Sequence, residues 1–403
     1  MFGIIFKPNM KRVYLDYAAA TPLDPRVKKI MNEYLVNGAA NPSGLYEEGR
    51  EAKKALEEAR KTVAAFIGVK PSEIVFTSST TESNNLAILG AARANKSRGK
   101  HLITTAVEHV SVLNPFKQLE REGFEVTYLL VDEYGRVTAE QIKQAIKPDT
   151  ILVSVIFASN EIGTLNPIKE IGRGIKTLRQ AQGKGVNGLP IFFSDAAQAA
   201  PHVKINVDNL GLDLMSFSSS KIYGPKGAAA LYVKHGVKID PVMLGGSQEN
   251  GLRPGTQDVA GITGFAEAIR ITSQERETED ARLLVLRDRI IKEVQSALPE
   301  VLLNGHPQER LANNISFSIP TVKAEELVTA LDLAGFALST RSACDAQNPT
   351  PPHVIKAIGH SDEEAWGTVR ITLGRFTTEE DINIFIKTFI SKINQLKKHA
   401  QTY

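Results

Sequence analysis

The chain has 403 residues, of which 42% are hydrophobic and 23% are charged, and its formal net charge is +3. This length and composition predict a globular protein with one large and one smaller domain. Because Lys and Arg are interspersed with Asp and Glu, the charge pattern argues against a nucleic-acid-binding or membrane-surface protein.

The chain ends and the single cysteine set further bounds. The opening run "FGIIF" is too short for the apolar core of a signal peptide, and no run approaches the roughly 20 apolar residues of a membrane span. Cys344 is the only cysteine, so an intramolecular disulfide or a cysteine-cluster metal site is excluded. We therefore expect a reducing, cytoplasmic location and no metal.

Short apolar runs alternate with amphipathic stretches between about residues 70 and 235. This alternation predicts βαβ units and a largely parallel sheet. Because the runs are apolar throughout, the strands should be buried on both faces. The expected strands are 73–77, 101–107, 124–131, 151–157, 190–195, 212–218 and 228–233.

A long charged helix is expected over 274–298, leading away from this first domain. Beyond it, strand-like runs such as "NNISFSI" and "TVRITLG" mix with helical patterns, which indicates a smaller α+β domain. The predicted fold class is α/β, with a mainly parallel seven-stranded sheet flanked by helices. We place the large domain at 22–265 and the small domain at 1–21 and 266–403.

The stretch "VFTSSTTESNN" is a candidate phosphate cradle. A buried strand ends at Thr77 and a helix begins near Glu82, so the hydroxyls of Thr80 and Thr81 meet unpaired backbone N–H groups at a helix N-terminus. Such an end binds anions well. Taken alone, the segment is better explained as an ordinary helix cap with an acidic residue in the first turn.

Two further polar residues follow apolar strands. Asp195 ends "FFSD" and Lys221 follows "LMSFSSS", at the strand ends where α/β sheets usually bind ligands. A carboxylate and a lysine beside a phosphate cradle are typical of a pyridoxal phosphate site. In such a site the lysine forms a Schiff base and the carboxylate keeps the pyridine nitrogen protonated.

The chain resembles a known family almost from end to end. It is similar to the cysteine desulfurases of the NifS/IscS type, which are fold-type-I pyridoxal phosphate enzymes of the class V aminotransferase family. The stretches that carry the resemblance, in chain order, are "VYLDYAAATPLDPRV", "NPSGLYEEGR", "EIVFTSSTTESNNLAI", "EHVSVL", "LEREGFEVTYL", "TILVSVIFASNEIG", "DLMSFSSSKIYGPKGAAALYV", "GLRPGTQDVAG", "RSAC" and "VRITLGRFTTEED".

The resemblance implies pyridoxal 5'-phosphate as the cofactor of the large domain. Lys221 would hold it covalently, Asp195 would pair with the pyridine nitrogen, and Gln198 with the phenolic oxygen. His109 would stack on the ring and move protons. The residues implied around the phosphate are Thr80, Thr81, Ser218, Ser220 and Thr256. Thr256 would reach across from a second subunit, which implies a homodimer with composite active sites.

The resemblance also implies the substrate and the reaction. Asn160 and Arg370 would bind the carboxylate of L-cysteine, since a planar guanidinium suits a bidentate grip. Lys221 and His109 would move protons while the Cys344 thiolate takes the substrate sulfur. The products would be alanine and a persulfide, whose acceptors are an iron–sulfur scaffold and possibly a tRNA-thiolating protein.

Residues around Cys344 bear on this role independently. Pro351 and Pro352 follow it closely, so the segment cannot be regular helix or central strand. Free cysteines are more often buried and inert. However, Arg341 lies three residues away and a nearby cation favours the thiolate.

Two positions depart from the family pattern. Ser220 replaces the histidine that usually precedes the Schiff-base lysine and contacts the phosphate, which predicts weaker cofactor retention. Arg341 replaces a glycine of the cysteine loop, so a backbone conformation with positive φ is less favoured there.

Two alternative functions remain open from the sequence. The first is another enzyme on the same scaffold, such as a selenocysteine lyase or an aminotransferase, for which Cys344 would be dispensable. The second is a catalytically weak paralogue that binds a partner protein. The altered Ser220 and Arg341 favour this second reading, whereas the intact set of Lys221, Asp195 and His109 opposes it.

Overall fold

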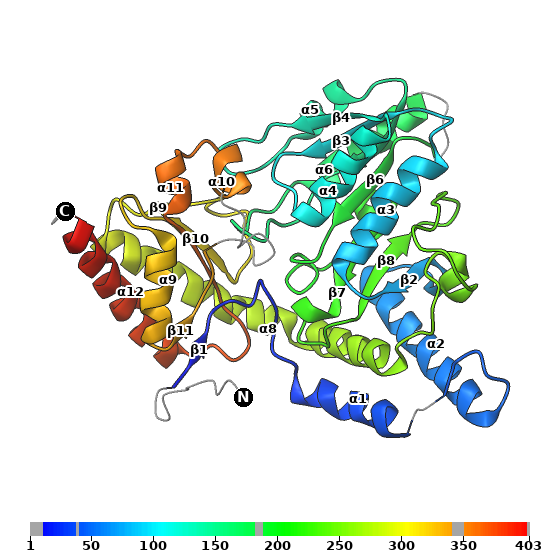
Figure 1. Cartoon of the computed structure of the whole chain (residues 1–403), viewed down its shortest axis with the longest axis horizontal. Coiled ribbons are helices and arrows are strands. Elements are labelled where there is room, and N and C mark those ends of the chain that lie inside the picture. The colour runs from blue at the N-terminus through cyan, green and yellow to red at the C-terminus, as the bar shows by residue number, and fades with distance from the viewer. Residues whose placement is uncertain (1–10, 38–39, 182–187, 341–349, 401–403) are drawn as a thin grey trace.

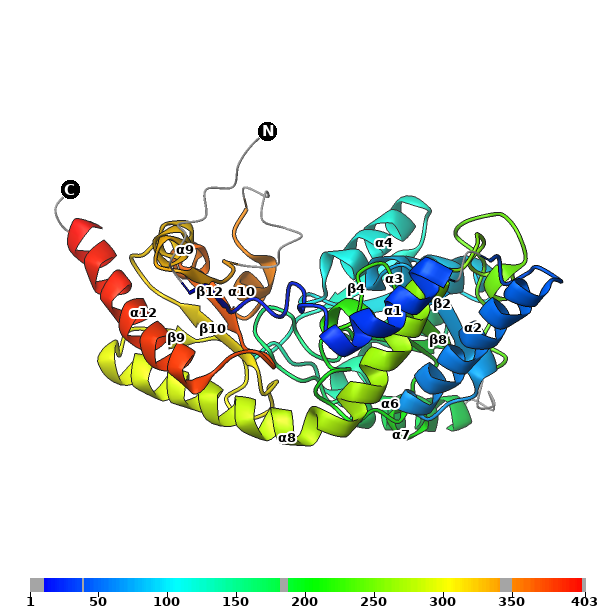
Figure 2. The same ribbon diagram turned by 90° about the horizontal axis from the view of Figure 1, so that it is seen from below.

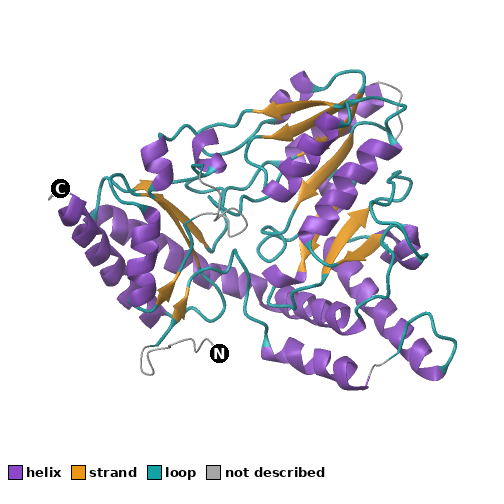
Figure 3. Ribbon diagram, in the orientation of Figure 1, coloured by secondary structure: helices purple, strands orange, loops and turns teal. Residues whose placement is uncertain are grey.

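The computed structural model describes residues 11–37, 40–181, 188–340 and 350–400 of the chain. These residues form two bodies, each built on its own sheet, and a long helix runs through both (Figure 1). Figure 3 shows the two groups of strands separately, with helices around each. Cys344 and Arg341 lie outside the described residues.

The larger body contains a seven-stranded sheet in the order β2-β8-β7-β6-β5-β3-β4. β8 pairs antiparallel with both of its neighbours, and the other pairs are parallel. The mainly parallel seven-stranded sheet predicted from the sequence is therefore confirmed. The strands are β2 Ile74–Thr77, β3 His101–Thr105, β4 Glu125–Leu129, β5 Thr150–Ser154, β6 Ile191–Asp195, β7 Leu214–Ser218 and β8 Ala229–Val233.

Helices cover both faces of this sheet. In β2, Val75 packs into the hydrophobic cluster under α3 and α4, whereas Phe76 packs into the cluster on the opposite face. This alternation explains why consecutive residues of β2 are apolar. The expected burial on both faces does not hold for the edge strand β4, in which Glu125 is exposed and the other residues are half-buried. The helices of this body are α1 Pro25–Asn37, α2 Glu47–Ile67, α3 Thr80–Ala94, α4 Val110–Arg121, α5 Ala139–Ala145, α6 Ile168–Ala181 and α7 Val207–Leu210, with short 3₁₀ turns η1 Pro71–Glu73, η2 Ser219–Lys221 and η3 Gln248–Gly251.

Helix α8, Val259–Ala297, begins well before the expected helix over 274–298. Asp258 caps it by accepting a hydrogen bond from the Gly261 N–H at 2.9 Å. Its first part packs into the core of the larger body through Phe265, and its later part packs into a second core through Ile290. Figure 2 shows the helix running continuously along both bodies. The domain boundary that we place after residue 265 falls inside this helix and stays a prediction.

The smaller body contains a three-stranded antiparallel sheet in the order β12-β10-β9 and a parallel pair of β1 with β11. Helices α9 and α12 pack on it around the second core, which gives an α+β arrangement. Its elements are β1 Val13–Tyr14, β9 Leu302–Leu303, β10 Asn314–Ser318, β11 Phe336–Ala337, β12 Thr368–Thr372, α9 Ala324–Leu333, α10 His353–Ala357, α11 Asp362–Trp366 and α12 Glu379–Ala400.

Within the described residues, every helix is too short or too polar to cross a membrane.

Candidate active site

A cavity of about 170 Å³ lies where the strand ends of the larger body face β12 and the segment that follows β1. Ten of the residues predicted from the sequence line it, so residues far apart in the chain are brought together. They are Thr80, Thr81, His109, Asn160, Asp195, Gln198, Ser218, Ser220, Lys221 and Arg370.

One end of the cavity is the N-terminus of α3. Ser79 caps this helix, because its hydroxyl accepts a hydrogen bond from the Glu82 N–H at 3.2 Å. The Thr80 hydroxyl is buried and has no hydrogen-bond partner among the described residues. Unpaired N–H groups and an unsatisfied hydroxyl at a helix N-terminus fit a phosphate group. Ser218 and Ser220, whose hydroxyls lie 3.3 Å apart, line the same cavity.

Lys221 ends the 3₁₀ turn that follows β7. Its Nζ donates to the carbonyl oxygens of Ala18 at 2.8 Å and Ala19 at 2.5 Å. The Ala18 oxygen also accepts from Nε2 of Gln198 at 3.0 Å. The segment between β1 and α1 therefore holds the amine at the cavity by its backbone.

Asp195 ends β6 and is 4% exposed. Its Oδ1 accepts from the Ala197 N–H at 2.9 Å, and its Oδ2 accepts from Nδ2 of Asn84 at 2.8 Å. These two bonds fix a buried carboxylate at the edge of the cavity. A carboxylate held in this way can stabilise a protonated ring nitrogen.

His109 is the N-cap residue of α4. Its Nδ1 accepts from the Ser111 N–H at 3.1 Å and lies 2.7 Å from the Ser111 hydroxyl. Because Nδ1 is an acceptor, the hydrogen-bond pattern assigns the proton of the neutral ring to Nε2. Burial lowers the pKa of His109, and Asp195 opposes this shift. The ring therefore remains neutral to a lower pH than an exposed histidine.

Arg370 lies on β12 and is 2% exposed. Its Nη2 donates to Oδ1 of Asp16 at 2.8 Å, and its Nη1 donates to the carbonyl oxygen of Asn160 at 3.0 Å. Asp16 orients the guanidinium and offsets its charge in a buried place. The cavity thus contains an oriented cation suited to a carboxylate.

One predicted residue does not line the cavity, and another lies outside the described part of the chain. Thr256 is exposed and lies outside the residues that line it. Cys344 lies outside the described residues. On its N-terminal side the described chain reaches the cavity, since Ser339 and Arg370 exchange backbone hydrogen bonds of 3.3 and 2.7 Å.

The sequence reasoning missed several residues that support the site. Asn84 donates to both Asp195 and Ser111, and Asp16 pairs with Arg370. Asn84 follows Ser83 inside a helix whose other inward positions are apolar, and that pair of polar residues was the available signal. Asp16 gave no such signal, because its partner is 354 positions away.

The donor set fits pyridoxal 5'-phosphate. A phosphate cradle, an amine, a buried carboxylate and an imidazole all face one cavity. Among the described residues, no group of three or more His, Cys, Asp or Glu side chains could hold a metal ion.

Comparisons with known proteins agree with this geometry. A family model described as aminotransferase class-V matches residues 13–385. Cysteine desulfurase IscS of Dictyoglomus turgidum is 46% identical over 399 residues, covering 98% of each chain. Cysteine desulfurase IscS 1 of Archaeoglobus fulgidus is 43% identical, covering 97% of this chain and 99% of that relative. A solved NifS-like protein superposes with a TM-score of 0.87 at 33% identity, covering 95% of this chain and 99% of its own. The resemblance seen in the motifs is therefore confirmed.

Proposed function

The chain belongs to the class V aminotransferase family, and from this membership we propose that it is a pyridoxal 5'-phosphate-dependent cysteine desulfurase. It converts L-cysteine to L-alanine and transfers the sulfur to its own single cysteine thiol. The observation that carries the proposal is the single cavity that gathers Lys221, Asp195, His109 and Arg370, in a chain similar over nearly its full length to cysteine desulfurases.

Each residue has a defined task in this reaction. When bound, pyridoxal 5'-phosphate supplies an electron sink for bond changes at the substrate carbons. Lys221 holds the cofactor through its Nζ, and Asp195 holds a proton on the pyridine nitrogen. Arg370 and Asn160 bind the substrate carboxylate. His109 and the Lys221 amine would move protons to and from the substrate carbons.

Cys344 completes the chemistry. Its thiolate attacks the substrate sulfur, the bond between Cβ and sulfur breaks, and protons from the active site complete the methyl group of alanine. One thiol and one cysteine thereby become one persulfide and one alanine, with no external oxidant or reductant. A thiolate is the required nucleophile, and Cys344 is the only cysteine in the chain.

The remaining assignments belong to the same proposal. Thr80, Thr81, Ser218 and Ser220 hold the phosphate, with Gln198 on the phenolic oxygen. Thr256, exposed and away from its own cavity, contacts the phosphate bound by a second copy in a homodimer. The persulfide is passed to an acceptor protein, either an iron–sulfur scaffold or a tRNA-thiolation protein. A carrier thiol of this kind works in a reducing compartment, which favours the cytoplasm.

Product analysis of three proteins tests the proposal. Wild type, Lys221→Ala and Cys344→Ser are loaded with cofactor, incubated with L-cysteine and a thiol reductant, and assayed for alanine and sulfide. Wild type should release both in equal amounts, and both variants should lose almost all activity. Full activity of Cys344→Ser on selenocysteine but not on cysteine would instead favour a selenocysteine lyase. A wild-type protein that takes up no cofactor would favour a partner-binding paralogue.

A further inference from the structure

Glu108 is a buried carboxyl group that the proposed reaction does not use. It immediately precedes His109, in the turn between β3 and α4, and its side chain is 0% exposed. Acidic side chains are almost never fully buried unless they are paired. Among the described ion pairs, none includes Glu108, and a buried carboxylate without a cation is costly.

The two carboxyl oxygens have different surroundings. Oε1 accepts from the Ile156 N–H at 2.7 Å and from the Thr105 hydroxyl at 3.0 Å. Oε2 is buried and makes no hydrogen bond with the described part of the chain. In a neutral carboxylic acid the carbonyl oxygen only accepts hydrogen bonds, and the other oxygen carries the proton. Oε1, which accepts two hydrogen bonds, matches the carbonyl oxygen, and Oε2, to which no described group donates, matches the protonated oxygen.

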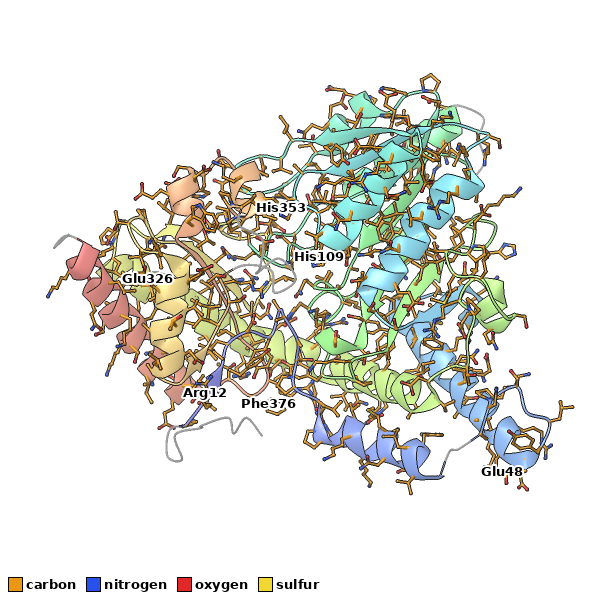
Figure 4. All side chains as sticks on the ribbon, in the orientation of Figure 1. Arg12, Glu48, His109, Glu326, His353 and Phe376 are labelled. Carbon is orange, nitrogen blue, oxygen red and sulfur yellow. The ribbon has the colours of Figure 1, made fainter. Side chains whose placement is uncertain are left out.

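Burial is the largest cause that raises the pKa of Glu108, to about 8, and the negative charge of Asp195 on β6 adds to this shift, while the hydrogen bonds from Ile156 and Thr105 oppose it. Two histidines also lie nearby. His109 follows it directly. From the small body, His353 of α10 places its Nε2 2.9 Å from the Glu108 carbonyl oxygen. Figure 4 shows His109 and His353 close together where the two bodies meet.

We propose that Glu108 is a positioning residue for His109, and that it works as a neutral carboxylic acid tying the His109 turn to the end of β5. The hydrogen bond from the Ile156 N–H connects Glu108 to one particular wall of the cavity. Ile156, which donates to Oε1, also lines the cavity and leads to Asn160. Glu108 therefore fixes the imidazole relative to the segment that carries a substrate-binding residue. This inference rests on the proposed function, in which His109 moves protons.

Packing around the hydrogen bond between Ile156 and Glu108 makes the turn before His109 sensitive to the loss of the Glu108 carboxyl group. Val107 and Ile156 belong to a small hydrophobic cluster with Val354, Ile355 and Ile358 of the α10 region. Without the Glu108 carboxyl, the Ile156 N–H would be buried without a partner, and the turn would be free to shift toward or away from that cluster. A displacement of about 1 Å at a proton-transfer group can lower turnover on the order of 10²-fold.

Two substitutions at Glu108 in the cofactor-loaded enzyme test the hydrogen bond to Oε1 separately from the ability of the group to ionise. Glu108→Gln keeps an acceptor oxygen and is neutral, so its kcat should stay within about threefold of wild type. Glu108→Ala removes the tie, so its kcat should fall by about 10- to 100-fold while KM for cysteine changes less than about twofold. Absorbance of the bound cofactor confirms that both variants are loaded.

Thermal unfolding across pH 5 to 8 gives a readout that does not depend on turnover. An unfolded glutamate loses its proton near pH 4.3, whereas buried Glu108 keeps it to about pH 8. In that window only the unfolded chain releases the proton, so rising pH favours unfolding of wild type. Glu108→Gln cannot release a proton. The stability of wild type relative to Glu108→Gln should therefore decline as pH rises from 5 to 8.

A second pair of variants covers the case in which Glu108→Ala does not fold. Thr105→Val removes one donor to Oε1 and should lower kcat at least about threefold. Thr104→Val is the matched control, since the Thr104 hydroxyl has no partner in the described residues, and it should leave kcat unchanged.

The outcomes distinguish this inference from the proposed function. Parallel pH slopes for wild type and Glu108→Gln, or a Gln variant as impaired as the Ala variant, would overturn the inference. If wild type makes no alanine, the proposed function fails together with the positioning role. The pH comparison then still decides whether Glu108 is neutral.

Discussion

Asn84 uses three of its hydrogen-bonding positions at the centre of the site. Its Nδ2 donates to Asp195 and Ser111, each at 2.8 Å, and its Oδ1 accepts from the Ser216 hydroxyl at 2.5 Å. Through Ser111 it also reaches His109. One buried amide therefore orients both the carboxylate expected at the pyridine nitrogen and the imidazole expected to move protons.

Replacing Asn84 with alanine should reduce stability and activity together. Asp195 and Ser111 would each lose a buried hydrogen bond, which costs about 1–3 kcal/mol for a buried group left unsatisfied. Urea unfolding of the cofactor-loaded protein measures this loss, and kcat should fall as well. The control is Asn85→Ala, because the Asn85 side chain donates only to the Thr81 carbonyl within the same helix. Equal effects of the two substitutions would contradict the role of Asn84.

Ser220→His should tighten cofactor binding. The Ser220 side chain lines the cavity, and among the described residues its hydroxyl hydrogen-bonds the Ser218 hydroxyl. An imidazole at this position would add a charged hydrogen bond to the phosphate, worth about 1.5–3 kcal/mol. Equilibrium dialysis should therefore show an affinity about tenfold higher or more. Ser220→Ala serves as the control and should bind no more tightly than wild type. A histidine variant with unchanged affinity would contradict this explanation of the departure from the family.

Which site residues the sequence could predict follows from their position in the fold. Asp195 and Lys221 were predicted because each follows an apolar strand, and parallel strand ends meet at one edge of a sheet. Both side chains line one cavity, and their roles there stay predictions. Asp16 and Asn84 were missed, because their value depends on partners that approach only after folding. Glu108 was missed because a single acidic residue beside a histidine is usually solvent-exposed.

Helix α10 is the element that joins the small body to the His109 turn. His353 begins it and hydrogen-bonds the Glu108 carbonyl at 2.9 Å, while Val354 and Ile355 are buried in the cluster with Val107. This helix follows the segment that contains Cys344. The contact therefore fixes the described chain on the C-terminal side of the proposed nucleophile against the residue before His109.

His353→Ala should loosen this junction. Loss of one hydrogen bond costs about 1 kcal/mol, so hydrogen exchange of the α10 amides should become about five times faster if they exchange through local opening. The control is His360→Ala, because His360 lies beyond α10 and contacts Glu364 instead. Unchanged exchange in His353→Ala, or equal changes in both variants, would contradict the assignment.

At the scale of elements, strands were easier to predict than the long helix. Most strands of the large sheet are largely apolar runs between polar turns, because both of their faces are buried. The start of α8 has no comparable pattern. The eight consecutive residues from Val259 to Ala266 are all buried, so the first part lacks the 3.6-residue alternation by which the later, charged part was recognised.

A network of charged residues joins the two bodies between the start of α1 and the chain that follows β12. Asp24, just before α1, is 2% exposed and accepts from Arg26 at 2.8 to 3.0 Å. It also pairs with Arg375, which follows β12 and places its guanidinium 4.3 Å from the Tyr223 ring centre. Hydrogen bonds from Arg26 are the main cause that lowers the pKa of Asp24.

Asp24→Asn should lower the melting temperature at pH 7 by several degrees, since the half-exposed Arg26 and the largely buried Arg375 both lose their charge partner. The direction of the pKa shift fixes the pH dependence. The contribution of Asp24 is fully present above the unfolded pKa of about 3.9 and is lost as pH falls through the lower folded value. Thermal unfolding should therefore show a gap between the two proteins that closes below about pH 4.

The control for this prediction is Glu58→Gln. Glu58 pairs with Lys61 on the surface, where both side chains are about 60% exposed, and such pairs contribute little. Its melting temperature should match that of wild type across the same pH range. A gap for Asp24→Asn that stayed constant down to the lowest pH would contradict the electrostatic explanation.

The backbone passes between the two bodies at two places, and these differ in stiffness. One is α8, whose 39 residues form a continuous helix about 58 Å long, and such a helix curves only gently unless a kink interrupts it. The other is the short turn after β1, whose Ala18 and Ala19 carbonyls receive the Lys221 amine. The lysine that would carry the cofactor is therefore hydrogen-bonded to one of the two segments that connect the bodies. A change in the position of that segment would change the hydrogen bonds of the amine directly.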